Sequence, residues 1–259
     1  MTTIQEHWNQ RASLGEKAGT QDLILKRLEQ RASLAEIRAY FSGFYDDSRI
    51  LEIGCGLGET ASLVAAARQG LNVLAIDNAP KMIEQARARD HSPRVVFSVR
   101  DVTDLPRGPF DIIYSQRCLI NLPTWEEQFA ALEAIAVRLM PSGRFLMCEH
   151  SQDGLDHIND VRTSWNRPAI QRPWHNRYFQ DSELAAFTSL ELLRCVPFSA
   201  TYYFLSRVLN DKLAEAEGKE PPYDAHINTF AGRLPADCVD PRFAQGRLWV
   251  WEKPLKVGA

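Results

Sequence analysis

The sequence has 259 residues, of which 45% are hydrophobic and 24% charged, and its formal net charge is -3. This length suits a single α/β domain with a large core, and the small negative charge disfavours a broad nucleic-acid-binding surface. No apolar run approaches the roughly 20 residues that cross a bilayer, and the polar start lacks the pattern of a signal peptide. We therefore expect a cytoplasmic protein with no nucleic-acid or membrane partner.

The cysteines and histidines indicate neither a disulfide nor a metal site. The five cysteines are widely spaced and form no C-x-x-C pair, and the six histidines show neither H-x-x-x-H nor H-E-x-x-H spacing. Cysteine within an apolar run usually behaves as a small buried hydrophobe. We expect reduced core thiols at Cys55, Cys118, Cys148, Cys195 and Cys238.

Apolar residues recur at helical spacing over residues 20–44, after a polar opening segment. Strand and helix patterns then alternate along the chain. Strands are predicted at 49–53, 71–77, 94–101, 110–116 and 144–150, and helices at 58–69, 79–90 and 124–140. Such alternation is typical of a parallel sheet with helices on both faces, where ligands bind along the edge formed by the carboxyl ends of the strands.

Beyond residue 150 the pattern is less regular. We expect a long polar loop at 151–180, a short helix at 181–187, a strand-rich run at 190–204, an exposed helix at 206–220 and a last strand at 246–254. The predicted fold is a doubly wound, mostly parallel seven-stranded Rossmann-like sheet, with an N-terminal helical cap and an insertion before the last strand.

Three glycines alternate in the stretch Glu52-Ile53-Gly54-Cys55-Gly56-Leu57-Gly58-Glu59, between a predicted strand and a predicted helix. Glycine lets the chain turn tightly and lets backbone approach a ligand, and the helix presents unpaired N–H groups. A dinucleotide site has the spacing G-x-G-x-x-G, with pyrophosphate on the helix N-terminus. Here Glu59 replaces the third glycine and Glu52 precedes the turn, which favours a cationic ligand with an amino group.

This stretch resembles the first motif, E/D-x-G-x-G-x-G, of the class I S-adenosylmethionine-dependent methyltransferases, and four further elements of that family follow in order up to residue 150. An acidic residue at the end of the second strand can accept both hydroxyls of a ribose, and Asp77 stands there. The resemblance implies that S-adenosylmethionine is the cofactor. The residues it assigns are Glu52, Gly54, Cys55, Gly56 and Gly58 at the glycine turn, Asp77, Asn78 and Met82 around the ribose and adenine, Asp101 and Val102 at the adenine amino group, and Gln116 and Arg117 at the active-site rim.

The N-terminal segment HWNQRASLGEKAGTQD is similar to segments that fold over the cofactor in family members. The resemblance implies that Trp8, Arg11 and Thr20 close the cofactor pocket, with Arg11 or Thr20 on the methionine carboxylate. The alternative is a frayed, solvated terminus. A tryptophan gains by burying its ring, which favours the closing role for Trp8.

The stretch 149–179 begins at the same edge of the predicted sheet and is rich in side chains that bind polar ligands. A polar loop of this length is more often functional than not. We predict His175 as the general base, and Glu149 as a carboxylate that neutralises a basic acceptor or orients an arginine. The predicted acceptor-binding residues are Asn121, His150, Asn159, Arg162, Trp174, Asn176 and Tyr178, with Tyr202, Tyr203 and Tyr223 as further candidates.

These patterns predict methyl transfer from S-adenosylmethionine to an O or N atom of a small polar metabolite. The chain has neither the N/D-P-P-Y motif of base and amide N-methyltransferases nor the twin cysteines of RNA cytosine methyltransferases. The alternatives are a protein side-chain methyltransferase, a non-catalytic S-adenosylmethionine-binding subunit, and an NAD(P)-dependent oxidoreductase, which Glu59 disfavours.

The expected organisation is one methyltransferase domain that spans residues 1–259. It divides into an N-terminal helical cap (1–45), a cofactor-binding core (46–150), and acceptor-side loops with the C-terminal strands (151–259). The segment 200–245 either roofs the acceptor pocket or forms the contact of a homodimer.

Overall fold

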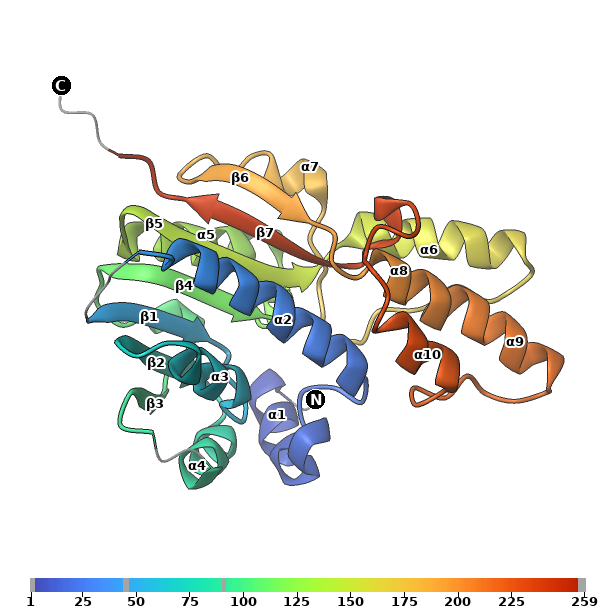
Figure 1. Ribbon diagram of the computed structural model, residues 1–259, viewed down its shortest axis with the longest axis horizontal. Coiled ribbons are helices and arrows are strands. Elements are labelled where there is room, and N and C mark those ends of the chain that lie inside the picture. The colour runs from blue at the N-terminus through green and yellow to red at the C-terminus, as the bar shows by residue number, and fades with distance from the viewer. Residues whose placement is uncertain (1–2, 44–46, 90–91, 256–259) are drawn as a thin grey trace.

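In the computed structural model, which describes residues 3–43, 47–89 and 92–255, seven strands form one sheet in the order β3-β2-β1-β4-β5-β7-β6 (Figure 1). Strands β1 to β5 pair in parallel, and β7 runs antiparallel to both of its neighbours. The strands are β1 (Ser48–Ile53), β2 (Leu71–Asp77), β3 (Val95–Val99), β4 (Phe110–Gln116), β5 (Leu139–His150), β6 (Glu191–Val196) and β7 (Gly246–Glu252). The predicted seven-stranded, mostly parallel Rossmann-like sheet is confirmed.

Helices cover both faces of the sheet (Figure 1). On one face, α2 (Leu23–Tyr40), α3 (Glu59–Ala67) and α4 (Pro80–Arg89) share an apolar cluster with the strands. On the other face, α5 (Trp125–Arg138) packs in a second cluster. A capping box at Thr124 starts α5, because its side chain and that of Glu127 satisfy each other's backbone N–H groups.

The N-terminal cap is helical, as predicted. The predicted range 1–45 contains α1 (Ile4–Arg11), the 3-10 helix η1 (Ala12–Lys17) and α2, of which α1 packs against α4. Trp8 lies half-buried on a small apolar cluster that includes Leu57 and Met82. Packing therefore holds the segment in place. The predicted boundary between cap and core, at residues 45 and 46, lies outside the described residues.

The polar stretch after β5 is only partly a loop. Helix α6 (Gln152–Ser164) fills its first half, and the side chain of Ser151 caps it. Leu155 and Ile158 are buried on one face of this helix, at a spacing that a strongly polar sequence obscures. The expectation of a loop from 151 to 180 is wrong for these thirteen residues.

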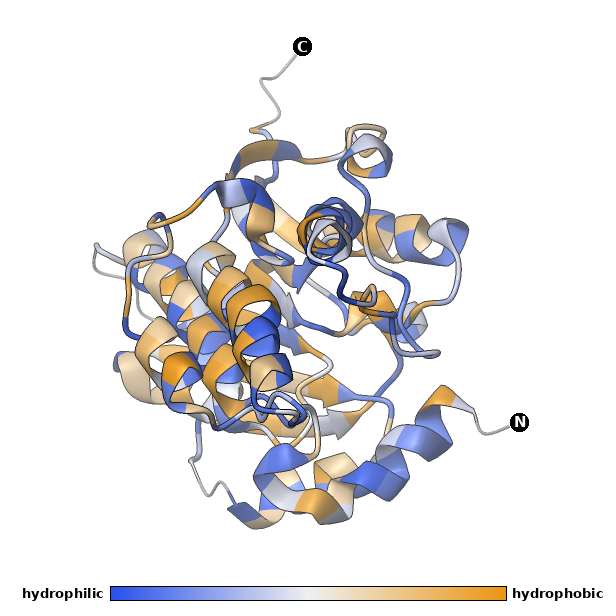
Figure 2. Ribbon diagram, turned by 90° about the vertical axis from the view of Figure 1, so that its right-hand side faces the viewer, coloured by the Kyte–Doolittle hydropathy of each residue, from blue (hydrophilic) through white to orange (hydrophobic). Residues whose placement is uncertain are grey.

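A helical insertion connects β6 to β7 and gathers with α6 at the carboxyl end of the parallel strands, the end that Figure 2 faces. The expected strand-rich run at 190–204 is therefore wrong beyond Val196, because Ala200 begins a helix that buries Tyr202 and Tyr203. The remaining elements are α7 (Asp181–Leu184), α8 (Ala200–Tyr203), the π-helix η4 (Phe204–Leu209), α9 (Asn210–Ala216), α10 (His226–Ala231), and the 3-10 helices η2 (Val102–Asp104), η3 (Leu119–Asn121) and η5 (Pro241–Phe243).

The five cysteines are unpaired, but they are not all in the core. Cys55 and Cys148 are buried and Cys118 is partly buried, whereas Cys195 and Cys238 are exposed. Cys195 lies on β6, an edge strand that leaves most of its residues open to solvent. Within the described residues, no helix combines the length and the apolar character that crossing a bilayer requires.

Candidate functional site

The glycine turn between β1 and α3 is built for close approach of the backbone. Gly54, Gly56 and Gly58 have φ angles of +71°, +52° and +76°, a region that glycine occupies without steric cost. A Cβ at Gly54 would collide with the side chain of Cys118, and one at Gly58 with the ring of Phe97. A Cβ at Gly56 would meet nothing within 4 Å, so this glycine opens the turn toward empty space.

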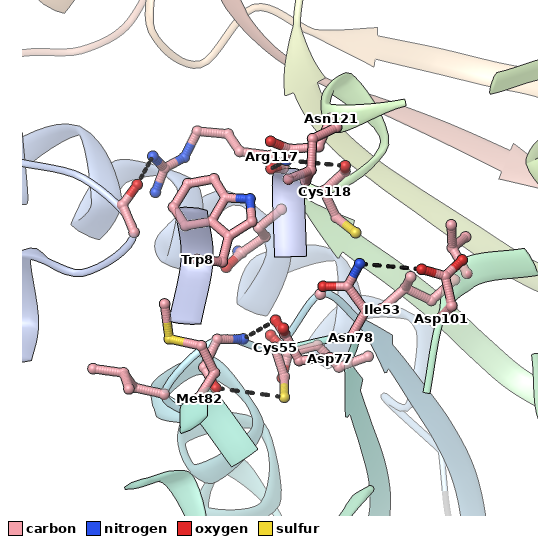
Figure 3. Close-up of a pocket in the computed structure, with 18 of the residues that line it drawn as sticks. Trp8, Ile53, Cys55, Asp77, Asn78, Met82, Asp101, Arg117, Cys118 and Asn121 are labelled. Carbon is pink, nitrogen blue, oxygen red and sulfur yellow. Dashed lines mark hydrogen bonds between the residues drawn. The ribbon is translucent and has the colours of Figure 1, made fainter. Parts of the chain in front are cut away.

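That space is a cavity of about 380 Å³ at the carboxyl ends of β1, β2 and β4, which we call the first cavity. Trp8 and Arg117 lie on one side of it, and strand-end residues Asp77, Asn78 and Asp101 on the other (Figure 3). The cavity joins segments that are far apart in sequence: the N-terminal cap, the glycine turn, and the loops after β2, β3 and β4.

Hydrogen bonds fix the acidic strand ends. The Asp77 carboxylate accepts from the backbone N–H groups of Gly56 and Ala79, each at 2.9 Å, and its pKa is raised because burial opposes the charge. The Asn78 amide donates to Asp101 at 3.1 Å. Burial opposes ionisation of Asp101 as well, but hydrogen bonds from Thr103 and Asn78 outweigh it and lower the pKa.

The two glutamates that flank the glycine turn differ in environment. Glu52 is 2% exposed, lines the first cavity, and has an Oε2 atom with no hydrogen-bond partner among the described residues. Burial, reinforced by the charge of Asp77, raises its pKa to about 8. Glu59 instead forms an ion pair with Lys26 and lies 3.6 Å from Arg89. The negative charge of Glu59 is thus balanced by Lys26 and Arg89. The carboxyl oxygen without a hydrogen-bond partner among the described residues belongs to Glu52.

A second cavity, of about 300 Å³, adjoins the first, and Trp8, Gly19 and Arg117 line both. Arg117 pairs with Glu29 at 2.9 Å and donates from Nη1 to the Gly19 carbonyl at 3.0 Å. Burial opposes the charge on Arg117, but Glu29 outweighs this effect and raises its pKa. The boundary between the two cavities therefore carries a fixed cation.

His150 lies at the end of β5, is 8% exposed, and lines the second cavity. Its Nε2 lies 3.3 Å from the Tyr203 hydroxyl and 3.8 Å from Glu29, and its Nδ1 lies 3.3 Å from the Gln245 amide nitrogen. Burial lowers its pKa despite Glu29. His150 is therefore a neutral, well-held polar group of the wall.

Four rings form a cluster where α1 meets the loop after α6. The His175 ring centroid lies 4.5 Å from that of His7, 5.4 Å from that of Trp8 and 5.4 Å from that of Trp174. Burial, followed by the charges of His7 and Arg11, lowers the pKa of His175 to about 4. Its Nδ1 is buried without a hydrogen-bond partner among the described residues.

Comparison with known proteins shows which proteins this chain resembles. The family model described as "Methyltransferase domain" matches residues 50–143. The sequence is 34% identical over 105 residues to the ubiquinone biosynthesis O-methyltransferase of Xylella fastidiosa, which covers 39% of this chain and 41% of that protein. It is 38% identical over 74 residues to the trans-aconitate 2-methyltransferase of Methylobacterium radiotolerans, and this alignment covers 28% of each of the two chains.

The match over residues 50–143 supports a class I S-adenosylmethionine-dependent methyltransferase. The alignments nevertheless span less than half the length of these curated relatives. Solved structures extend the likeness of fold to the whole chain. A putative methyltransferase of Haloferax volcanii, solved with the Trm112 activator, covers 99% of this chain and is itself covered completely, with a TM-score of 0.65 and 15% identity.

A putative S-adenosylmethionine-dependent methyltransferase of Listeria monocytogenes covers 88% of this chain and 99% of its own, with a TM-score of 0.55 and 14% identity. The [4+2]-cyclase SpnF matches with a TM-score of 0.55 and 21% identity, over 86% of this chain and 80% of its own. Likeness at this identity shows the methyltransferase fold and leaves the reaction open.

The first cavity fits the cofactor of this family. S-adenosylmethionine carries an amino group, a ribose diol and an adenine. Glu52 has a carboxyl oxygen without a partner among the described residues, Asp77 lies partly buried at the end of β2 in the cavity wall, and Gly56 presents bare backbone. A buried acceptor without a partner is costly, and a cationic amino group would satisfy it.

Most of the residues predicted to bind the cofactor lie around the first cavity, and their roles there stay predictions. Gly58 does not line it, since its position is filled by Phe97. Arg11 and Thr20 line the second cavity instead, and Arg11 donates to the carbonyls of Lys17 and Ala18. The predicted cofactor residues that line the first cavity are Trp8, Glu52, Gly54, Cys55, Gly56, Asp77, Asn78, Met82, Asp101, Val102, Gln116 and Arg117.

The predicted acceptor residues are divided by the structure. His150, His175, Asn176 and Tyr178 line the second cavity. Asn121 lines the first cavity, and Trp174 is 65% exposed outside both.

Three other predicted residues lie outside both cavities and hold the fold. Glu149 accepts from the Ser115 hydroxyl at 2.8 Å and from the backbone N–H groups at the start of η3, so it anchors the loop after β4 and touches no acceptor space. Asn159 bonds the backbone of Ile170, and Arg162 pairs with Asp211. The polar atoms of these three are used within the protein and neither cavity is lined by them, so their predicted roles stay predictions that the cavities do not support.

The sequence analysis missed three charged residues of the second cavity or its rim: Asp22, Glu29 and Arg207. Asp22 and Arg207 form an ion pair across 185 positions of sequence, and Glu29 lies inside α2. A charged residue at a buried position of a helical pattern is the signal that could have found Glu29. Of the further candidates, Tyr203 and Tyr223 line the cavity, whereas Tyr202 bonds Asp22.

Proposed function

We propose that this protein transfers a methyl group from S-adenosylmethionine to an O or N atom of a small polar metabolite. The observation that carries the proposal is the pair of adjoining cavities, which meet at Trp8, Gly19 and Arg117. When bound, the cofactor supplies a methyl group activated by a sulfonium. The work of the chain is then to align two reactants and exclude water, which are large contributions in a displacement reaction.

The residues of the chain have separable roles in this proposal. Glu52 and Asp77 bind the amino group and the ribose diol, and Trp8 closes the first cavity from the N-terminal side. In the second cavity, His175 offers a buried nitrogen without a partner, which suits a group that accepts the proton of the acceptor. Its pKa of about 4 keeps His175 neutral near pH 7 but makes it a weak base in the unliganded protein, so this role requires that the bound acceptor raise the pKa.

A small acceptor is favoured over a protein side chain because the wall of the second cavity is buried, with Tyr178 and Tyr203 almost inaccessible. A non-catalytic subunit would have no need for a second cavity beside the cofactor. Cytoplasmic location, a homodimer and the absence of a nucleic-acid partner stay predictions.

Protection against thermal unfolding tests the proposal. S-adenosylhomocysteine should raise the melting temperature and NADH should not, because a ligand stabilises the folded state only where it binds. Asp77→Asn should reduce the affinity for S-adenosylhomocysteine about tenfold or more, since it removes a charged acceptor from the ribose.

Asp104→Asn is the matched control, since Asp104 lies nearby but outside the first cavity, on an exposed ion pair with Arg100. Protection by NADH alone would replace the proposal with an oxidoreductase. A screen of amines, phenols and hydroxy acids with labelled methyl donor, read by mass, then identifies the acceptor class.

A further inference from the structure

Arg207 belongs to the insertion between β6 and β7 and lines the second cavity. Arg207 lies in the π-helix η4, between α8 and α9, and lines the second cavity but not the first. Single π-turns within helices are frequent at functional sites. The turn here brings a cation into a wall otherwise rich in rings.

Contacts on several sides hold the Arg207 guanidinium in one orientation. It lies over the rings of Tyr202, Tyr203 and Tyr223, at 5.9, 5.3 and 5.0 Å from their centroids. Its Nη2 donates to Asp22. Burial opposes the charge, but Asp22 and the tyrosines outweigh it and raise the pKa of Arg207.

A guanidinium has five N–H donors in a planar fork. The bond to Asp22 uses Nη2, which leaves other donors of the fork for a ligand in the cavity. Asp22 itself has little left to offer, because it also accepts from the Leu25 backbone and the Tyr202 hydroxyl. The pair therefore presents donors, and not acceptors, to the cavity.

The fixed charges around the second cavity leave an excess of one positive charge. Three arginines line it, Arg11, Arg117 and Arg207, and two carboxylates pair with them, Glu29 with Arg117 and Asp22 with Arg207. Burial lowers the pKa values of all three histidines in the wall, His7, His150 and His175, so they add no charge near pH 7. The unpaired charge is that of Arg11, which favours a monoanion such as a carboxylate in this cavity, whereas the free donors of Arg207 fix where the carboxylate binds.

The rest of the wall suits a flat ligand. Tyr178, Tyr203, Tyr223 and His150 contribute rings, and rings pair by stacking or edge-to-face contact. A volume of about 300 Å³ lies at the lower end of ligand-site volumes. A ligand of one ring with short substituents is what such a space admits.

We propose that the acceptor is a single-ring aromatic carboxylate, whose carboxylate binds the fork of Arg207 and whose nucleophilic atom faces the boundary at Arg117. This inference rests on the proposed function, because it identifies the second cavity as the acceptor site. The second cavity thus binds the carboxylate end of the acceptor at Arg207 and directs the opposite end of the acceptor toward the cofactor.

Matched probes test the proposal by binding alone. With the protein saturated by S-adenosylhomocysteine, titration calorimetry compares 3,4-dihydroxybenzoate with 3,4-dihydroxybenzamide, which has the same shape without the charge. The benzoate should bind about tenfold more tightly or better, since a charge-assisted hydrogen bond is about twice as strong as a neutral one.

The double variant Asp22→Asn/Arg207→Gln removes the ion pair as a unit, so that no buried charge is left alone, and asparagine still caps α2. It should reduce the preference for the benzoate to about threefold or less, because the donors of Arg207 are lost while Arg11 keeps the net charge of the cavity. Arg233→Gln, at an exposed position outside both cavities, is the matched control and should keep the preference.

Equal binding of the two probes to the wild type would overturn the inference, as would no binding of either up to about 10 mM. A preference that survives in the double variant would remove Arg207 from it. Failure of the proposed function is distinguishable, because it shows as absent binding of S-adenosylhomocysteine in the first titration, before any probe is added.

Discussion

Glu52 shows how one carboxyl group can serve ligand binding at the expense of the unliganded fold. It is buried at the end of β1, and its Oε2 lacks a hydrogen-bond partner among the described residues. Desolvation raises its pKa to about 8. The folded chain therefore takes up a proton that the unfolded chain, with a pKa near 4.5, gives up.

Glu52→Gln should stabilise the unliganded protein. Because the folded-state pKa lies above the unfolded-state value, wild-type stability falls as pH rises from about 4.5 to 8. Glutamine avoids that loss, so the free energy of unfolding at pH 7 should rise by about 3 kcal/mol in denaturant titrations. Affinity for S-adenosylhomocysteine should fall, because the amino group loses its carboxylate. A variant less stable than the wild type at pH 7 and at pH 8 would contradict this account.

At the scale of elements, the contact between α1 and the loop after α6 depends on rings that can become charged. His7 and Trp8 come from α1, and Trp174 and His175 from the loop. Burial lowers the pKa values of both histidines, and Arg11, which faces them from α1, lowers them further. The two rings are thus held in their neutral forms.

Acid should loosen this contact before it unfolds the core. A histidine whose folded-state pKa is lowered contributes stability above its unfolded-state value, and this is lost as pH falls through the folded-state pKa. The window here runs from about pH 6.5 to 4. Hydrogen exchange of α1 should accelerate within it while the central strands stay protected. In His175→Phe, α1 should keep its protection to lower pH, and an unchanged profile would exclude the mechanism.

Elements of strong periodicity could be predicted from the sequence, and elements set by distant contacts could not. The five strands from β1 to β5 follow from short apolar runs, and the glycine turn follows from its spacing. Helix α6 escaped because its polar residues conceal only two buried aliphatic positions, Leu155 and Ile158. The strand expected at 200–204 became helix because the tyrosines there pack on a separate apolar cluster.

The candidate site divides in the same way. Many residues of the first cavity lie at the ends of the strands β1 to β4, and each of these strand ends carries a short motif that the sequence shows. Those of the second cavity depend on side-chain partners far apart in sequence, such as Asp22 with Arg207. A polar composition could locate this region but could not tell Glu149 and Arg162, which bond within the protein, from His150, which lines the cavity.

At the scale of the whole molecule, several contacts between distant segments favour the single domain, which stays a prediction. Arg162 of α6 pairs with Asp211 of α9 in a buried ion pair, and β7 joins β6 to the parallel strands. The second cavity is walled by the N-terminal cap, the end of β5 and the insertion together.

The chain from residue 3 to 255 should therefore unfold in one cooperative step. Far-ultraviolet circular dichroism and the fluorescence of tryptophans, two of which lie on β7, should give the same denaturant midpoint. S-adenosylhomocysteine at about one hundred times its dissociation constant should move both midpoints together, by about 2.7 kcal/mol of stability. Two separated transitions would instead divide the chain near the insertion.

The place of β7 in the sheet also bears on how the protein is made. In the described part of the chain, β6 pairs only with β7. An insertion of about fifty residues separates the two strands in the sequence. During synthesis, β6 has no strand to pair with until the last strand emerges, an interval of about 3–10 s at ordinary elongation rates. The nascent chain thus carries an unpaired hydrophobic edge at β5 throughout that interval, and a chaperone that shields this edge would raise the yield of folded protein.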